Sequence, residues 1–101
     1  EGATALHFIA KRCLAEACAA LLAREDFTEV NAKDKQGKTA LHWAAAAGCP
    51  DVCGQILLHR SFTEAGAEDY LGRSARDFAR QVGHEECQRI LGMLRLRAGD
   101  K

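Results

Sequence analysis

The sequence lacks an excess of charge of either sign, because 14 lysine and arginine residues balance 14 aspartate and glutamate residues. A protein that is drawn to nucleic acid or to an anionic membrane by its overall field needs a basic surplus, so neither partner is expected. Long apolar runs are missing too. A membrane-spanning helix needs roughly 18 apolar residues, and charged residues interrupt the best candidate, residues 3–22. We therefore expect no direct insertion into a membrane.

Motifs of catalysis and cofactor binding are also missing. The chain has no glycine-rich phosphate loop, no nucleophile elbow and no metal-ligand motif, and its acidic residues scatter as solvent-exposed residues do. We expect a protein that is not an enzyme, with no catalytic residues, no cofactor, no metal and no small-molecule substrate.

The cysteines do not have the layout of a disulfide scaffold, because their number is odd and four of the five fall among alanines and leucines of predicted helices. Free buried thiols are the prediction, which favours a reducing intracellular compartment, cytoplasmic or nuclear. Cys49 is the one thiol expected to have a lowered pKa, since it precedes a predicted helix. A zinc site or redox sensor built from Cys49, Cys53, His84 and Cys87 ranks last, because two ligand pairs on adjacent repeats would lie about 8–10 Å apart.

What the sequence does contain is an internal repeat. Gly2, Gly37 and Gly72 recur every 35 residues (37 − 2 and 72 − 37). Behind them, in one register, follow Thr4-Ala5-Leu6-His7, Thr39-Ala40-Leu41-His42 and Ser74-Ala75-Arg76-Asp77. A fixed period between about 20 and 50 residues is typical of a solenoid, in which each unit buries its apolar face against its neighbours.

The best-formed copy carries a resemblance to a known family. Its pattern, Asp34-x-x-Gly37-x-Thr39-Ala40-Leu41-His42-x-Ala44-Ala45-x-x-Gly48, resembles the ankyrin repeat with its T-P-L-H-x-A-A core. The period exceeds the family's usual length of about 33 residues, and the extra residues fall around Phe27 and Phe62. Alanine also stands where the family usually has proline. The resemblance implies an all-α solenoid of helix pairs with projecting β-hairpin fingers.

We predict one ankyrin-repeat domain over residues 1–101. Repeat one spans 1–33 and lacks its first finger, repeat two spans 34–68, and repeat three with a C-terminal cap spans 69–101. Because the chain starts inside a repeat, we expect the natural protein to continue upstream. Helical spacing predicts a buried stripe at Leu14, Ala17, Cys18, Leu21 and Leu22, and Gly48 and Pro50 suit a helix end and a helix start.

One set of candidate binding residues is an aromatic row. Phe8, Trp43 and Phe78 occupy the same repeat position, which the resemblance places on the first helices near the concave groove where partners dock. Exposed aromatic residues suit binding hot spots; the alternative is half-buried packing between helices. Ala46, on the same predicted helix as Trp43, is a further candidate. The family's bracing histidine corresponds to His7 and His42.

The second set lies at the finger tips. Lys35, Gln36 and Lys38 crowd the first tip, and Tyr70, Leu71 and Arg73 form the second. Tyr70 and Leu71 are an apolar pair at a turn, where solvated residues are usual, which favours contact with a partner. Packing against the neighbouring finger is the alternative.

The resemblance implies a protein–protein interaction module that binds another protein or complex through its concave helix face and hairpin tips. The alternative is a structural or linker subunit held permanently in a larger complex. Because the inserts around Phe27 and Phe62 resemble ankyrin arrays of photosynthetic algae, that host could be a photosynthetic membrane complex facing the plastid stroma.

Overall fold

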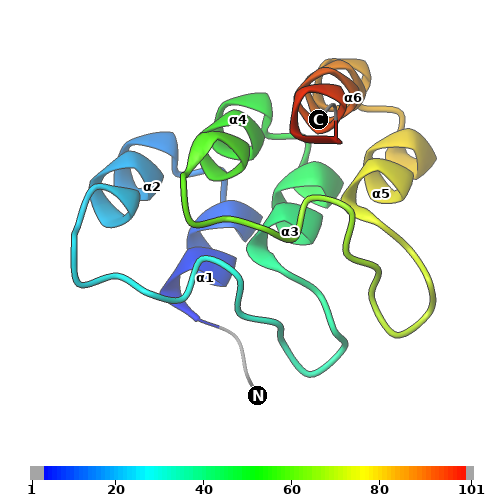
Figure 1. Cartoon of the computed structure of the whole chain (residues 1–101). Coiled ribbons are helices and arrows are strands. Elements are labelled where there is room, and N and C mark those ends of the chain that lie inside the picture. Colours follow the sequence, from blue (N-terminus) through cyan, green and yellow to red (C-terminus); the bar gives the residue numbers. More distant parts are fainter. Residues whose placement is uncertain (1–3, 100–101) are drawn as a thin grey trace.

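The computed structural model describes the backbone of residues 4–99 and the side chains of residues 4–92, and this part of the chain contains six helices. Helices α1, α3 and α5 form one layer, and α2, α4 and α6 form a second layer that lies above it in the view of Figure 1. Loops of 17 or fewer residues project from one side of the array. The helices are α1 (Ala5–Lys11), α2 (Ala15–Leu22), α3 (Ala40–Ala47), α4 (Pro50–Leu58), α5 (Ala75–Val82) and α6 (Glu85–Gly99).

The first-layer helices begin in the same way in all three repeats. Thr4, Thr39 and Ser74 are the N-cap residues in extended conformation. The side chain three residues later accepts a hydrogen bond from the N-cap backbone N–H, at 3.0 Å in each case, through Nδ1 of His7 and His42 and through Oδ2 of Asp77. A repeated cap satisfies a backbone donor that the helix leaves unpaired, which explains why the repeat fixes the starting point of each helix.

The same helices end in a left-handed turn. Gly48 and Gly83 follow α3 and α5 at φ of 74° and 78°, a conformation that glycine adopts without a steric cost. The equivalent position after α1 holds Cys13, whose φ is 59°. A non-glycine residue there costs about 1–2 kcal/mol, so repeat one carries backbone strain that its neighbours avoid.

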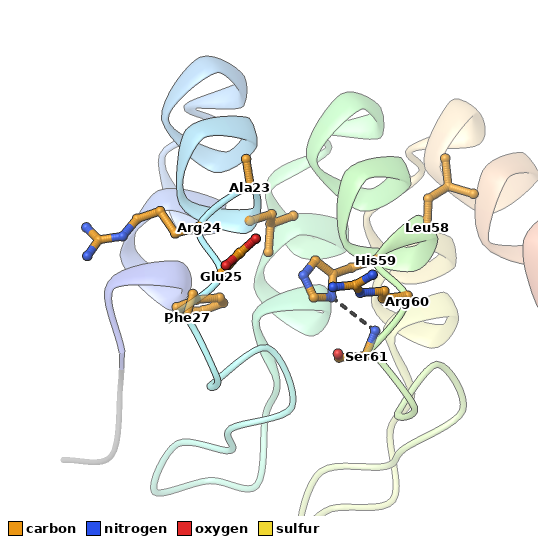
Figure 2. Close-up of a pocket in the computed structure, with 9 residues that line it drawn as sticks. Ala23, Arg24, Glu25, Phe27, Leu58, His59, Arg60 and Ser61 are labelled. Atoms are coloured by element: carbon orange, nitrogen blue, oxygen red, sulfur yellow. Dashed lines mark hydrogen bonds between the residues drawn. The ribbon is translucent and has the colours of Figure 1, made fainter.

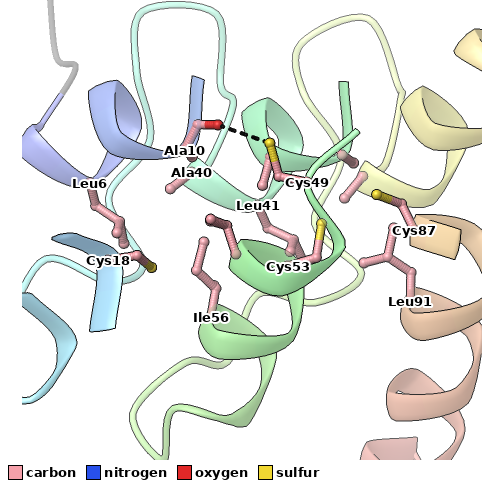
Figure 3. Close-up of a cluster of buried hydrophobic side chains, with 14 of the residues drawn as sticks. Leu6, Ala10, Cys18, Ala40, Leu41, Cys49, Cys53, Ile56, Cys87 and Leu91 are labelled. Atoms are coloured by element: carbon pink, nitrogen blue, oxygen red, sulfur yellow. Dashed lines mark hydrogen bonds between the residues drawn. The ribbon is translucent and has the colours of Figure 1, made fainter. Parts of the chain in front are cut away.

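The core lies between the two layers (Figure 3). Ala10, Ala44, Ala45 and Ala79 are fully buried, and these small side chains let the helices approach closely, while Leu6, Leu41, Val52 and Ile56 fill the space that remains. The predicted stripe on the second helix is wrong in part. Leu14 and Ala17 are exposed, because α2 packs mainly against α1 and α4 within the described chain.

The cysteines correct a second prediction. Cys13 and Cys49 are joined by a disulfide, with Cα atoms 5.5 Å apart, that ties repeat one to repeat two. Cys49 is therefore not a free thiol of lowered pKa. Cys18, Cys53 and Cys87 are free and buried as expected, and burial raises the pKa of Cys18 to about 11 and that of Cys53 further. Spacing could not reveal the bridge, which depends on how closely two repeats stack.

The projecting loops are turns rather than β-hairpins. Within residues 4–99 there is no strand, only an isolated antiparallel bridge between Glu68 and Ser74. Each tip is closed by an aspartate whose Oδ1 accepts two backbone N–H groups, from Gln36 and Lys38 to Asp34 and from Leu71 and Arg73 to Asp69, at 2.9–3.0 Å. Side-chain acceptors occupy these N–H groups, so they are not available for a strand ladder.

Hydrogen bonds between repeats fix the loops to the helices. Nε2 of His7 donates to the carbonyl of Lys38 at 2.9 Å, and Nε2 of His42 donates to the carbonyl of Arg73 at 3.0 Å. This tautomer follows from the backbone N–H that each Nδ1 accepts. The two histidines thus brace helix and loop as the resemblance implied. Asp77 makes the cap bonds with Ser74 and no such brace among the described residues.

Candidate functional site

Six side chains of the first-layer helices and loop tips form one surface, which we call the aromatic–basic face. Phe8, Trp43 and Phe78 come from α1, α3 and α5, and the cations Lys11, Lys38 and Arg73 lie over or between their rings. The repeat explains the arrangement, because residues 35 positions apart occupy equivalent places on neighbouring helices.

Trp43 lies at the centre of this face. Its indole N–H donates to Oδ2 of Asp34 at 2.9 Å, which answers the need of a half-buried indole for a partner. The ammonium groups of Lys38 and Lys11 lie 4.8 and 5.5 Å from its ring centroid. Both distances are within the range in which a cation is attracted to the face of an aromatic ring.

Phe78 and Phe8 have different environments despite their equivalent positions. The ring of Phe78 packs edge-on against His42, 5.7 Å between centroids, and beneath the Arg73 guanidinium at 4.6 Å. Phe8 is 61% exposed. The packing alternative therefore describes Phe78, whereas Phe8 is free for contact. The reason is the loop before each helix: loop residues cover Trp43 and Phe78, and no loop precedes α1 within the described residues.

Beside Phe8 the surface is hollowed. A shallow depression of about 120 Å³ is lined by His7, Phe8, Lys11 and Trp43. It is too small and open for a drug-sized molecule, but it could accept one side chain of a partner. Lys11 was not among the predicted site residues. Its register could have identified it, since Lys11 and Ala46 are 35 residues apart; Ala46 itself is half-buried.

The two loop aspartates remain ionised in this face. Burial opposes the ionisation of Asp34, but the N–H groups of Lys38, the indole and Gln36 outweigh it and lower its pKa. At Asp69, burial is likewise outweighed by the N–H of Arg73 and its guanidinium, 3.0 Å from Oδ2, so the pKa is lowered. Both carboxylates are structural parts of the loop tips rather than free acids.

The second loop tip carries the largest exposed apolar pair. Tyr70 and Leu71 are 76% and 77% exposed. The Tyr70 ring nevertheless lies on the backbone of Gly37, where an added Cβ would approach it to 2.7 Å, and the Tyr70 N–H donates to the carbonyl of Gln36 at 3.0 Å. One face of the ring thus packs on the neighbouring loop and the other faces solvent. A hollow of about 310 Å³ lies between the tips, lined by Lys35, Gln36, Lys38, Asp69, Tyr70, Leu71 and Arg73.

A larger hollow of about 430 Å³ lies on the opposite layer, at the ends of α2 and α4 (Figure 2). Two of its polar side chains are occupied: Arg24 turns away to pair with Asp26 at 2.8 Å, and Nδ1 of His59 accepts the Ser61 N–H at 3.2 Å. Glu25 and Arg60 also line it. Near this hollow, the Asn31 side-chain amide links the two interhelical loops by donating to the Ser61 carbonyl at 2.9 Å.

The described residues hold no group of three or more histidine, cysteine or acidic side chains that could bind a metal ion. Among these residues, no helix is both long and apolar enough to cross a membrane.

The comparison with known proteins agrees with the fold. No curated protein matches the sequence. A family model described as ankyrin repeats (3 copies) matches residues 1–68, which is about two thirds of the chain. Ankyrin repeats are generally protein–protein interaction modules, and the family is generally non-catalytic. The match, the three helix pairs and the histidine braces lead to one conclusion: the chain belongs to the ankyrin-repeat family.

Proposed function

We propose that this chain is a non-catalytic module that binds a partner protein through the aromatic–basic face and the second loop tip. The observation that carries the proposal is the continuity of this surface. Phe8 shares a hollow with Trp43, Lys38 lies over Trp43, and Lys38 also lines the hollow that Tyr70 and Leu71 border. The aromatic rings and Arg73 are residue types that are enriched in interface hot spots.

The support for this surface is rigid. The loop tips are closed by their aspartates, and histidine braces tie them to α1 and α3. A partner would dock with little rearrangement, which reduces the conformational entropy lost on binding. We expect a few residues to supply most of the affinity.

Affinity purification with the chain as bait, followed by crosslinking and mass spectrometry, tests the proposal. Phe8→Ala and Tyr70→Ala should each weaken binding of the captured partner by about tenfold or more, because both side chains present a large exposed apolar area. Leu58→Ala is the matched control, since Leu58 is 65% exposed on the opposite layer. Equal loss in all three variants, or loss in none, would reject this surface.

The permanent-subunit alternative predicts different behaviour of the isolated chain. Light scattering on the purified protein at several concentrations should show a monomer with one cooperative melt if the chain is a free module. Aggregation at low concentration would favour the subunit, because an obligate subunit exposes surface that its complex normally covers.

The compartment is a separate proposal. The three buried thiols fit the reducing cytoplasm, nucleus or plastid stroma, whereas the Cys13–Cys49 disulfide does not. Alkylation of free thiols in freshly lysed and denatured cells, followed by mass spectrometry, tests the compartment: a Cys13–Cys49 pair that stays unmodified until it is reduced would exclude a fully reducing compartment.

A further inference from the structure

Charge is distributed unequally between the two layers of this neutral chain. The second-layer helices carry acids in their first turns, namely Glu16 on α2, Asp51 on α4 and Glu85 and Glu86 on α6. The first-layer helices α1 and α5 carry bases in their last turns. Because α5 also carries Asp77 and α6 also carries Arg89, Arg95 and Arg97, the helices of the two layers differ modestly in net charge, +2 for the first layer and −1 for the second.

On the aromatic–basic face, hydrogen bonds and an ion pair within the chain already occupy the carboxylates. Asp34 accepts three N–H groups, and Asp69 accepts two and pairs with the Arg73 guanidinium. Lys11, Lys35 and Lys38 form no ion pair among the described residues. Three positive charges on this side consequently lack a partner within the described chain.

The positions of two of these lysines are defined by aromatic rings. The Lys38 ammonium lies between Trp43 and Phe78, 4.8 and 5.2 Å from their centroids, and the Lys11 ammonium lies 5.5 Å from the Trp43 centroid. The rings fix the place of each ammonium group and exclude water from one side of each. Lys11 lies beside the hollow that Phe8 and Trp43 line, and Lys38 lies between Trp43 and Phe78, so a segment that runs along the row of rings would pass both charges.

From this arrangement we infer that the partner docks an acidic segment on the aromatic–basic face. Carboxylates of the segment pair with Lys11 and with Lys38 along the row of rings, and an apolar side chain between or beside them enters the hollow next to Phe8. The inference rests on the proposed function and adds the chemistry of the partner. Nucleic acid fits less well, because the phosphate backbone calls for many more cations than this face offers.

Selection from a phage library of random 16-residue peptides tests the inference. The selected peptides should be rich in glutamate and aspartate, and their binding should quench or shift the fluorescence of Trp43, the only tryptophan in the chain. Affinity should fall as NaCl rises from 0.05 to 0.5 M, because salt screens exposed charges. Neutral or basic peptides, or no enrichment at all, would overturn the inference.

Charge variants provide the matched controls. Lys11→Gln and Lys38→Gln should each weaken binding of a selected peptide by about two- to fivefold, the effect of losing one exposed ion pair. Arg89→Gln removes the same charge from α6, on the opposite layer, and should change nothing. Duplex DNA or phosphatidylserine vesicles that bind as tightly as the peptides, with the same dependence on Lys11 and Lys38, would also overturn the inference.

Binding of the four variants to the natural partner shows whether the inference alone fails or the proposed function fails with it. If that partner needs Phe8 and Tyr70 but is indifferent to Lys11→Gln and Lys38→Gln, the surface is correct and the acidic segment is wrong. If none of the four positions matters, both proposals fail.

Discussion

Replacing Asp34 tests how the first loop tip and the aromatic–basic face depend on one side chain. Its carboxylate accepts the backbone N–H groups of Gln36 and Lys38 and the indole N–H of Trp43, each at 2.9 Å. Asp34→Ala removes all three hydrogen bonds. A hydrogen bond to a charged acceptor contributes about 1.5–3 kcal/mol when buried, and the half-exposed site reduces that value.

We therefore expect Asp34→Ala to lower the free energy of unfolding by about 2–3 kcal/mol. For a domain of this size, 1 kcal/mol shifts Tm by roughly 4–8 °C, so Tm should fall by about 10–20 °C. Asp34→Asn should cost less, about 1 kcal/mol, because the amide oxygen still closes the turn while its NH₂ group faces the indole N–H of Trp43.

Urea denaturation followed by circular dichroism and by Trp43 fluorescence measures both variants. The Trp43→Phe background isolates the indole bond, since Asp34→Asn should cost measurably less there than in the normal chain. The reasoning is refuted if Asp34→Ala costs under about 0.5 kcal/mol, the size of an ordinary surface substitution, or if Asn and Ala have the same effect.

Burial lowers the pKa of His42, although the Arg73 carbonyl and Asp69 oppose this. The unfolded chain then binds the proton more readily than the folded chain, so the free energy of unfolding should fall as pH drops below 6.5. In His42→Gln the urea midpoint should change less between pH 7.5 and 5.5 than in the normal chain. Gly37→Ala should lower Tm more than Gly72→Ala, because both have φ near +80° but only Gly37 lies beneath a tyrosine ring. Reduction of the Cys13–Cys49 disulfide should cost about 3–4 kcal/mol, given its sequence separation of 36; an unchanged melt in dithiothreitol would contradict it.

Several features of the fold were predictable because they depend on local sequence. The repeat placed Thr4, Thr39 and Ser74 in one register and Gly48 at a helix end, and these residues act within one helical turn, as N-caps and as a helix stop. The bracing role of His7 and His42 followed from the family resemblance. The β-hairpin fingers did not follow, because aspartate side chains occupy the backbone donors that strands would use.

The sequence by itself determined the period, the family and the order of the helix pairs, since these follow from residues that recur at fixed intervals. Only the tertiary structure decided that Phe8 is exposed while Phe78 is half-buried, that Trp43 donates to Asp34, and that Lys11 belongs to the same face. The physical reason is that equivalent positions in a solenoid share a backbone but not neighbours. What covers a side chain depends on the adjacent loop and helix, and that packing exists only once the repeats have stacked.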